Sequence, residues 1–153
     1  MARKVWIHYG SDKFDPEIMV KNSKRIYHSH KPNGLWGSPT DRNSWSWESW
    51  CKSNDYKPER LESYFKFRVS NKAKILWVHR MRDIDPYLIE GDSGYYFDCR
   101  LNTKLLMDKF DGIALIHGKN YSELHDNFFY SWDVDSICVW NPDVIELVKE
   151  GDK

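Results

Sequence analysis

Short runs of β-branched and aromatic residues recur along the chain, and most of them are closed by glycine, asparagine or proline. This pattern predicts strands. The runs are residues 5–9, 35–36, 64–69, 73–78, 113–116 and 136–140, and residues 144–148 add one further apolar element. Apolar and polar residues alternate within 64–69, as in a half-buried strand. The pair Asn71-Lys72 then predicts a hairpin that joins 64–69 to 73–78.

Other stretches carry the spacing and the start signals of helices. Asp15 and Pro16 predict a helix start, with Asp15 as the N-cap and Pro16 at the first position. Residues 44–54 predict a short helix capped by Ser44, and residues 97–110 carry apolar side chains at helical spacing. Strands with small helices between them predict an α+β fold with a mixed or antiparallel sheet. The 153 residues are expected to form a single domain, 1–153.

The composition is that of a folded protein, with 41% hydrophobic and 30% charged residues. No apolar run approaches the ~20 residues of a membrane span, and the N-terminal residues do not continue into the apolar segment of a signal peptide. The three cysteines are widely spaced, with no CxxC pair. We therefore expect reduced thiols in a cytoplasmic protein and no zinc site. The glycine-rich motifs of Rossmann, P-loop and α/β-hydrolase sites are absent from the sequence.

The net charge is zero, but the charges are unevenly spread. Residues 1–82 hold 17 Lys and Arg against 8 Asp and Glu, whereas residues 83–153 hold 6 against 15. This polarity indicates either a basic face for an anionic ligand or two halves of the fold that attract each other.

Four of the chain's eight tryptophans fall within residues 31–51, and they stand among Ser and Asn rather than Leu or Ile. They are Trp36, Trp45, Trp47 and Trp50. A buried indole needs a partner for its N–H, so a core helix seldom has this composition. Flat aromatic walls broken by small polar residues favour a pocket that stacks on a planar ring. The alternative is an irregular loop that tryptophan side chains pin onto the domain.

Two other stretches combine polar chemistry with the ends of strands. The first is His8-Tyr9-Gly10-Ser11, where an imidazole stands beside backbone groups that are free to bind a small amide or a ribose hydroxyl. The alternative is an ordinary surface or core histidine.

The second stretch contains Asp133 and Asp135, which precede the last strand. Residues two apart in an extended chain point to the same face. Paired carboxylates can stabilise a developing cation or take a proton. A capped loop before the strand is the structural alternative.

Together these stretches resemble the ADP-ribosyltransferase fold. The resemblance is to the branch with a His, an aromatic and an acid, which includes diphtheria toxin, the poly(ADP-ribose) polymerases and the rifampicin-modifying transferases. In that branch the strand-1 His is followed closely by Gly and Ser or Thr, and here one extra residue, Tyr9, stands between His8 and Gly10-Ser11. Gly34-Leu35-Trp36 matches its Gly-aromatic strand, which precedes a helix whose aromatic stacks on nicotinamide. Residues 136–145, SICVWNPDVI, have the outline of its late motif, VVYDPSQI.

The resemblance implies a split mixed or antiparallel sheet with short peripheral helices, and an NAD+-dependent mono-ADP-ribosyltransferase. It assigns the nicotinamide stack to Trp47, with Trp45 and Trp50 behind it, and it has His8 and the Gly10 backbone orient the amide and the ribose. The NAD+-binding set that it implies is His8, Tyr9, Gly10, Ser11, Leu35, Trp36, Ser38, Trp45 and Trp47. The acceptor is a protein side chain, a nucleic acid base or a small molecule, and the size of the chain suits a toxin-like effector.

The catalytic acid implied by the resemblance is Asp135 or Asp133, with His8 as its partner. The family more often has Tyr and Glu where this chain has Trp and Asp. A gapless match on Pro142 places Ser136 at the position of the acid, so either aspartate requires a local shift. The candidates to contact the pyrophosphate are Lys4, Lys24 and Arg25.

Two other functions stay open at this stage. An RNA 2′-phosphotransferase also uses NAD+ on a related fold, and its basic pocket would draw on Arg25, Arg42, Arg80 and Arg82. A non-catalytic module would instead stack the tryptophans on the bases of single-stranded nucleic acid while Lys and Arg contact the phosphates. The aspartates discriminate between these functions, because such a platform has no use for carboxylates, whereas a centre that cleaves NAD+ requires one.

Overall fold

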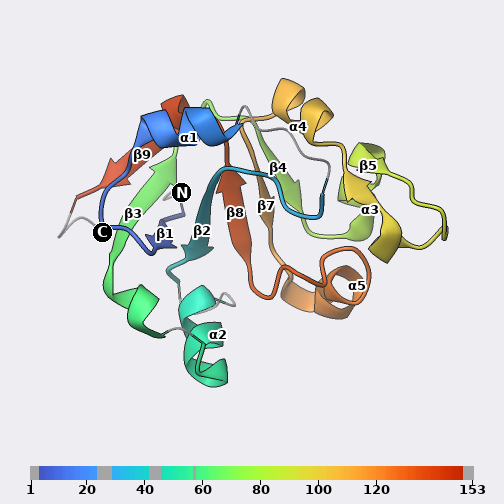
Figure 1. The fold of residues 1–153 in the computed structure, drawn as a ribbon, viewed down its shortest axis with the longest axis horizontal. Helices are drawn as coiled ribbons and strands as arrows, with labels where there is room; N and C mark the ends of the chain where they lie inside the picture. The colour runs from blue at the N-terminus through green and yellow to red at the C-terminus, as the bar shows by residue number, and fades with distance from the viewer. Residues whose placement is uncertain (1–3, 24–28, 42–45, 57, 150–153) are drawn as a thin grey trace.

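The computed structural model of the protein describes residues 4–23, 29–41, 46–56 and 58–149 (Figure 1). Its main sheet has seven strands in the order β4-β7-β8-β2-β1-β3-β9. These strands are β1 (Trp6–Tyr9), β2 (Leu35–Pro39), β3 (Tyr64–Val69), β4 (Ile75–Val78), β7 (Gly112–Leu115), β8 (Ser136–Val139) and β9 (Ile145–Val148). A separate ribbon pairs β5 (Leu88–Ile89) with β6 (Arg100–Leu101).

Short helices surround the sheet. They are α1 (Pro16–Ser23), α2 (Trp47–Asn54), α3 (Met81–Ile84), α4 (Thr103–Lys109) and α5 (Tyr121–His125). Single 3-10 turns cover η1 (Pro58–Glu62), η2 (Asp85–Tyr87), η3 (Tyr96–Asp98), η4 (Gly118–Asn120) and η5 (Pro142–Val144). In Figure 1, α1 and α4 lie at one end of the strands, and α2 and α5 lie at the other end.

The main sheet is mixed. Its neighbouring strands run antiparallel, except for β4 and β7, which run parallel. The prediction of an α+β fold with a mixed or antiparallel sheet is therefore confirmed. The strands β1 and β2 lie at the middle of this sheet and join its two halves, as Figure 1 shows.

Two hydrophobic clusters cover the two faces of the sheet, because alternate residues of β8 enter different clusters: Cys138 packs into the larger one, and Ile137 and Val139 pack into the other. The larger cluster includes Leu106 of α4, Leu124 of α5 and Phe129, all fully buried. The other joins Met19 of α1 to Phe67 of β3. Each large side chain that is fully buried contributes about 1.5–3 kcal/mol through the hydrophobic effect.

Two of the buried indoles donate their N–H groups to backbone carbonyls. Trp132 Nε1 donates to the carbonyl of His30 at 2.8 Å, and Trp140 Nε1 donates to the carbonyl of Phe110 at 2.7 Å. These bonds remove the cost of burying an indole N–H without an acceptor.

The three cysteines are buried, and none of them forms a disulfide, in agreement with the expectation of reduced thiols. Burial raises the pKa of the Cys51 and Cys138 thiols, so both stay protonated at neutral pH. No helix in the described ranges is long and apolar enough to cross a membrane.

Local sequence signals place most of the elements correctly. The expected strands 5–9, 64–69, 113–116 and 136–140 match β1, β3, β7 and β8 to within about one residue at each end, and the apolar element at 144–148 matches β9. At the start of α1, Asp15 Oδ1 accepts from the backbone N–H of Glu17 at 3.0 Å and of Ile18 at 3.2 Å, as an N-cap should.

The start of the next helix differs from the prediction. Ser46 is the N-cap of α2, and its Oγ accepts from the backbone N–H of Ser49 at 3.2 Å. The expected cap, Ser44, lies outside the described residues. Both serines fit an N-cap by type, so the residue type alone does not distinguish them.

The predicted hairpin of 64–69 with 73–78 is wrong. The strand β3 pairs with β1 and β9, whereas β4 pairs with β7 in the other half of the sheet. The residues between β3 and β4 are bonded to two different segments: the backbone N–H of Ser70 donates to Val144, and Lys74 and Asp111 exchange hydrogen bonds. These long-range bonds override the local turn signal.

The single helix predicted over 97–110 is also wrong. Its first part forms η3 and β6, and Leu101 pairs with Leu88 of β5. The helix α4 begins only after Asn102, whose side chain accepts from the backbone N–H of Leu105 at 3.2 Å. Asn102 is a favourable N-cap, and it interrupts the run of apolar residues at helical spacing.

Candidate functional site

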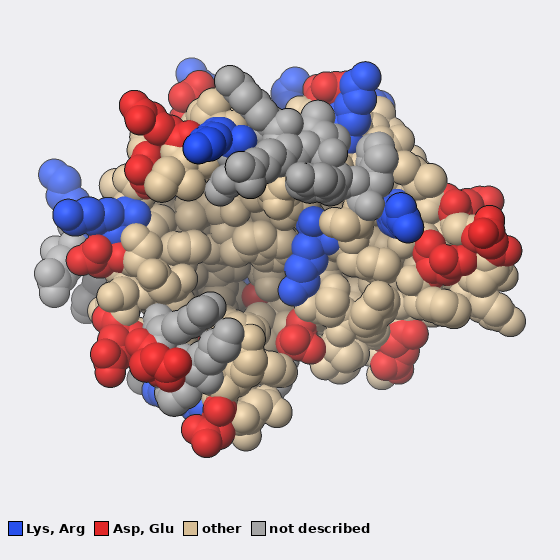
Figure 2. Space-filling model, viewed as in Figure 1, with Lys and Arg blue, Asp and Glu red and all other residues tan. Residues whose placement is uncertain are grey.

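A cavity of about 400 Å³ opens between the middle of the sheet and α2. Figure 2 shows the hollow on this face of the molecule, above α2. Its walls come from the end of β1, from β2, from α2 and from residues 131–136, which precede and begin β8. The sequence stretches singled out for their chemistry therefore meet at one cavity, although they are far apart in the chain.

The cavity begins where β1 and β2 separate. The ladder between these strands consists of the pairs Trp6 with Pro39 and Ile7 with Ser38. On its other side, β1 pairs with β3 along its whole length, so past Ile7 it has β3 as its only partner among the described strands. The side chain of His8 crosses the gap instead, and its Nδ1 lies 2.7 Å from the carbonyl oxygen of Trp36.

The contact between His8 and Trp36 determines the tautomer of the imidazole. A carbonyl oxygen only accepts, so Nδ1 carries the proton, and Nε2 of the neutral ring is left as an acceptor. The imidazole also packs against Phe65 of β3, with ring centroids 5.1 Å apart. His8 is therefore held at the wall of the cavity with a defined acceptor atom.

An aromatic wall stands opposite, on α2. Trp47 and Trp50 are stacked, with centroids 5.0 Å apart and planes 7° apart. Tyr56 packs its edge against both rings. The wall is fixed at its base because the backbone N–H of Trp47 donates to the hydroxyl of the buried Ser38 at 2.7 Å. The expectation that Trp47 and Trp50 share one face of a helix is confirmed.

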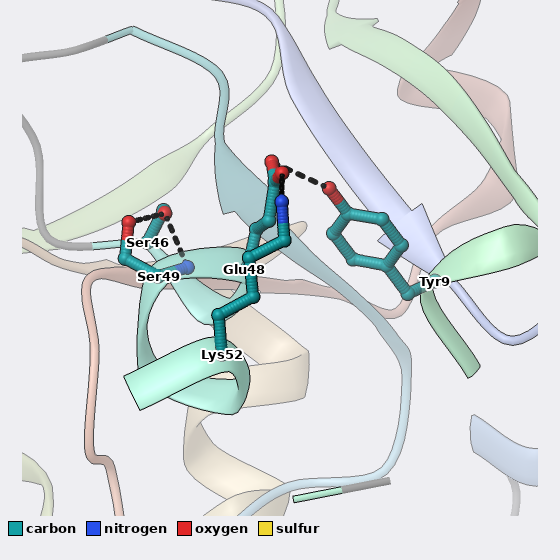
Figure 3. Close-up of polar contacts among 5 residues, drawn as sticks. All are labelled: Tyr9, Ser46, Glu48, Ser49 and Lys52. Carbon is teal, nitrogen blue, oxygen red and sulfur yellow. Dashed lines mark hydrogen bonds and ion pairs between the residues drawn. The ribbon is translucent and has the colours of Figure 1, made fainter. Parts of the chain in front are cut away.

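Polar contacts also tie α2 to β1, as Figure 3 shows. The hydroxyl of Tyr9 donates to Glu48 Oε2 at 3.4 Å, and Lys52 Nζ donates to Glu48 Oε1 at 2.7 Å. Burial, followed by the charge of Glu48, raises the pKa of Tyr9 far above its ordinary value. The hydrogen bond from Lys52 lowers the pKa of Glu48, so Glu48 stays ionised at neutral pH.

The two aspartates do not share a face. Asp133 lines the cavity, with its side chain 35% exposed, whereas Asp135 is buried with its side chain 5% exposed. The chain bends at Val134 instead of running extended from 133 to 135. The prediction that both carboxylates point the same way is therefore wrong, because the alternation of an extended chain does not hold across a bend.

Asp135 has a structural partner. One carboxylate oxygen, Oδ1, accepts from both the backbone N–H and the ring Nδ1 of His117, each at 2.8 Å. The next residue, Ser136, lines the cavity, and its hydroxyl donates to the carbonyl of Val134 at 2.9 Å. Asp135 therefore anchors the segment, while Asp133 and Ser136 face the cavity.

The positive charge at the cavity comes from a residue that sequence reasoning missed. Lys31 lines the cavity, and its ammonium group lies 5.8 Å from the ring centroid of Trp36. Among the predicted pyrophosphate contacts, Lys4 is paired with Asp41 at 3.4 Å and does not line the cavity. The other two, Lys24 and Arg25, lie outside the described residues.

The remaining candidates are distributed as follows. Tyr9, Trp36 and Ser38 line the cavity together with His8 and Trp47. Gly10 lines a second hollow of about 490 Å³ on the other side of Trp47, and its backbone N–H donates to Ser63. The hydroxyl of Ser11 bonds to the carbonyl of Lys13, Leu35 is buried in the core, and neither lines the cavity. Trp45 lies outside the described residues.

Two further cavity residues carried no signal in the sequence. Ser131 lines the cavity with a hydroxyl oxygen that is shielded from water and has no hydrogen-bond partner in the described part of the chain. Trp132 lines it beside Trp36, with ring centroids 4.8 Å apart. Within the described ranges, no group of three or more His, Cys, Asp and Glu side chains could hold a metal ion.

Comparisons with protein-family models, with curated proteins and with solved structures find no match to this chain.

Proposed function

We propose that the protein is an NAD+-dependent mono-ADP-ribosyltransferase with an ADP-ribosyltransferase-like split sheet. The observation that carries the proposal is the meeting of an imidazole, a stacked pair of indoles and a carboxylate at one cavity. These groups belong to His8, to Trp47 and Trp50, and to Asp133. The volume of about 400 Å³ lies in the range of small-molecule sites.

The arrangement of the strands supports the proposed fold. The three motifs that resemble the family lie on or beside β1, β2 and β8, and these strands are direct neighbours in the sheet. The pairing of β1 with β2 stops at Ile7, and His8 spans the gap that opens beyond it, which supports a split-sheet site at this place. Motifs that are far apart in the sequence therefore lie on neighbouring strands, as we expect for the proposed fold.

The reaction that fits this site breaks the bond between the ring nitrogen of nicotinamide and C1 of its ribose. Nicotinamide leaves with the bonding electron pair, which neutralises its ring charge, and positive charge builds up on the sugar. A carboxylate held beside the sugar stabilises that charge. The acceptor then bonds to the ribose carbon and loses a proton. With water as acceptor, the products are nicotinamide, ADP-ribose and one proton.

Asp133 is the carboxylate that we assign to this role, because its side chain reaches the cavity. Asp135 is committed to two hydrogen bonds from His117 and is shielded from any ligand in the cavity. The choice between the two aspartates thus follows from their exposure.

The other cavity residues fit the remaining parts of NAD+. The indole of Trp47 offers a flat wall for the cationic nicotinamide ring. The acceptor Nε2 of His8 suits a hydroxyl or amide donor of the ligand. Lys31 supplies a positive charge for the pyrophosphate.

The experiment incubates the purified protein with NAD+ and follows nicotinamide and ADP-ribose by NMR. Hydrolysis by water makes the assay independent of the true acceptor. We expect slow release of nicotinamide, and we expect Trp47→Leu to raise the KM for NAD+ about tenfold, the equivalent of one lost stacking contact. Trp77→Leu is the matched control, because Trp77 is 44% exposed on β4 and does not line the cavity.

Absence of release, together with absence of NAD+ binding in ligand-observed spectra, would overturn the proposal. The same proteins then test the nucleic-acid alternative by titration with a single-stranded oligonucleotide. Binding that weakens steeply with salt and requires Trp47 would favour a stacking platform.

A further inference from the structure

A row of aromatic and imidazole rings lies behind Asp133, outside the cavity. The ring of His117 lies 4.9 Å from that of Tyr121, and Tyr121 stacks on His125 with centroids 4.9 Å apart and planes 13° apart. The row runs along η4 and α5, and it joins the two aspartates of the neighbouring segment. His117 contacts Asp135, and His125 contacts Asp133.

The contact between His125 and Asp133 is an ion-pair contact. Nε2 of His125 lies 3.5 Å from Asp133 Oδ1. This nitrogen is shielded from water and makes no hydrogen bond within the described ranges. The two atoms are too far apart for a good hydrogen bond, so the contact is electrostatic and is strongest when the imidazole carries a positive charge.

The other contacts of His125 restrict its ring. Tyr121 covers one face of the ring, and Nδ1 lies 3.9 Å from Oδ1 of Asp126. Burial, followed by the charges of Asp133 and Asp126, raises the pKa of Tyr121, so its hydroxyl stays neutral. The charged groups that face His125 in the described structure are therefore Asp133 and Asp126.

The segment that carries Asp133 is fixed at its far end. The two hydrogen bonds from His117 to Asp135 hold the backbone just before β8. His125 then contacts the carboxylate itself. Together the two histidines leave Asp133 little freedom except rotation of its own side chain.

We propose that His125 is a positioning residue that orients the Asp133 carboxylate toward the cavity and makes its effective charge depend on pH. This inference rests on the proposed function for its catalytic consequence. The neutral imidazole packs beside Asp133 and leaves the negative charge of the carboxylate in place. The imidazolium adds a positive charge 3.5 Å from Asp133, which opposes the positive charge that develops on the ribose. Nicotinamide release therefore falls when His125 gains a second ring proton.

The test measures the contact and the reaction separately. The contact is followed by the carboxyl ¹³C signal of Asp133 between about pH 2 and 9, over the range in which denaturation curves show the protein to be folded, and the signal is assigned with Asp133→Asn. We expect two inflections, one from the carboxyl group and one from His125. His125→Gln keeps a nitrogen donor near the position of Nε2 and should remove the second inflection. His79→Gln is the matched control on an exposed histidine and should leave both inflections in place.

The reaction is followed by nicotinamide release in the same variants. His125→Gln should move the acid limb of kcat to lower pH, because only the protonation of Asp133 is left. His125→Ala should lower kcat about 10- to 100-fold, the typical cost of a misplaced catalytic group. The KM for NAD+ should stay within about twofold, because His125 does not line the cavity.

A single inflection of the Asp133 signal that His125→Gln does not change would show that His125 does not contact Asp133. This conclusion would hold whether or not nicotinamide is released. Two inflections with an acid limb that His125→Gln does not move would overturn the positioning role. Two inflections without nicotinamide release from any variant, including the wild type, would overturn the proposed function and, with it, the catalytic role of His125.

Discussion

The two aspartates before β8 have the same side chain and stand two positions apart, yet their environments differ. Asp135 is buried and accepts two hydrogen bonds from His117, whereas Asp133 is partly exposed at the cavity. No property of the residues themselves distinguishes them in the sequence. The bend at Val134 and the partner histidine decide which carboxylate is buried and which lies at the cavity.

Asp135→Ala should destabilise the protein by about 3 kcal/mol, because it leaves the N–H groups of His117 buried without an acceptor. Asp133→Asn should change the free energy of unfolding by less than about 0.5 kcal/mol, since its side chain is partly solvated. Urea denaturation of both variants at pH 7.5 measures the difference. Equal losses of stability would show that the burial and partnering of Asp135 do not hold in solution.

Some cavity residues cannot be recognised in the sequence from their residue type. Lys31 follows His30 in a loop without a motif, and its place beside Trp36 depends on contacts between segments distant in the sequence. The tryptophans stand out in the sequence because four of them fall within 21 residues. A lone lysine or serine carries no comparable signal.

At the scale of elements, α2 is the one whose position most directly defines the cavity. Its N-cap is Ser46, its first residue donates to Ser38 of β2, and Glu48 accepts from Tyr9 of β1 (Figure 3). The helix has eight residues, which is too short to be stable alone, so these contacts hold it in place.

The pH dependence of stability tests the contact between α2 and β1. The pKa of Tyr9 is raised in the folded protein, so above about pH 10 the unfolded chain loses a proton that the folded protein keeps. The contribution of Tyr9 to stability is therefore complete below about pH 10 and is lost as the pH rises further. Tyr9→Phe should be less stable than the wild type by about 0.5 kcal/mol at pH 8, and the gap should close and reverse near pH 11.

Urea denaturation of the wild type and Tyr9→Phe at pH 8 and pH 11 gives this comparison. The other tyrosines are common to both proteins and cancel in the difference. Tyr95→Phe, at a side chain that is 67% exposed, serves as the control. A gap between wild type and Tyr9→Phe that does not change with pH would show that the phenol of Tyr9 is not shielded next to Glu48.

At the scale of the whole molecule, the sequence predicted the α+β class and most strands, but not which strands are neighbours. The expected hairpin at 64–78 and the helix over 97–110 were both inferred from local spacing. Both failed where a distant segment supplied the partner: Val144 and Asp111 for the first, and Leu88 for the second. Pairing between distant strands is fixed by the packing of the core, which a window of ten residues does not contain.

The junction of the two halves of the sheet depends on a small residue in β2. A Cβ atom at Gly37 would lie 2.7 Å from Cζ of Phe67 and 3.1 Å from Cγ2 of Ile137, both fully buried. Gly37→Ala should therefore cost about 1–3 kcal/mol through overpacking. In Phe67→Leu, where the ring is removed, the added cost of Gly37→Ala should be smaller. Costs that simply add would show that Phe67 does not pack on Gly37.

The cavity is the proposed site of NAD+ cleavage, and Asp133, rather than Asp135, is the group proposed to stabilise the charge on the sugar. The most direct measurement is the rate of nicotinamide release by the wild type, Asp133→Asn and Asp135→Asn, at a temperature where denaturation curves show all three to be folded. We predict that Asp133→Asn lowers the rate at least about 100-fold, while Asp135→Asn stays within about tenfold of the wild type. Release that survives in Asp133→Asn and disappears in folded Asp135→Asn, or no release by the wild type at all, would contradict this proposal.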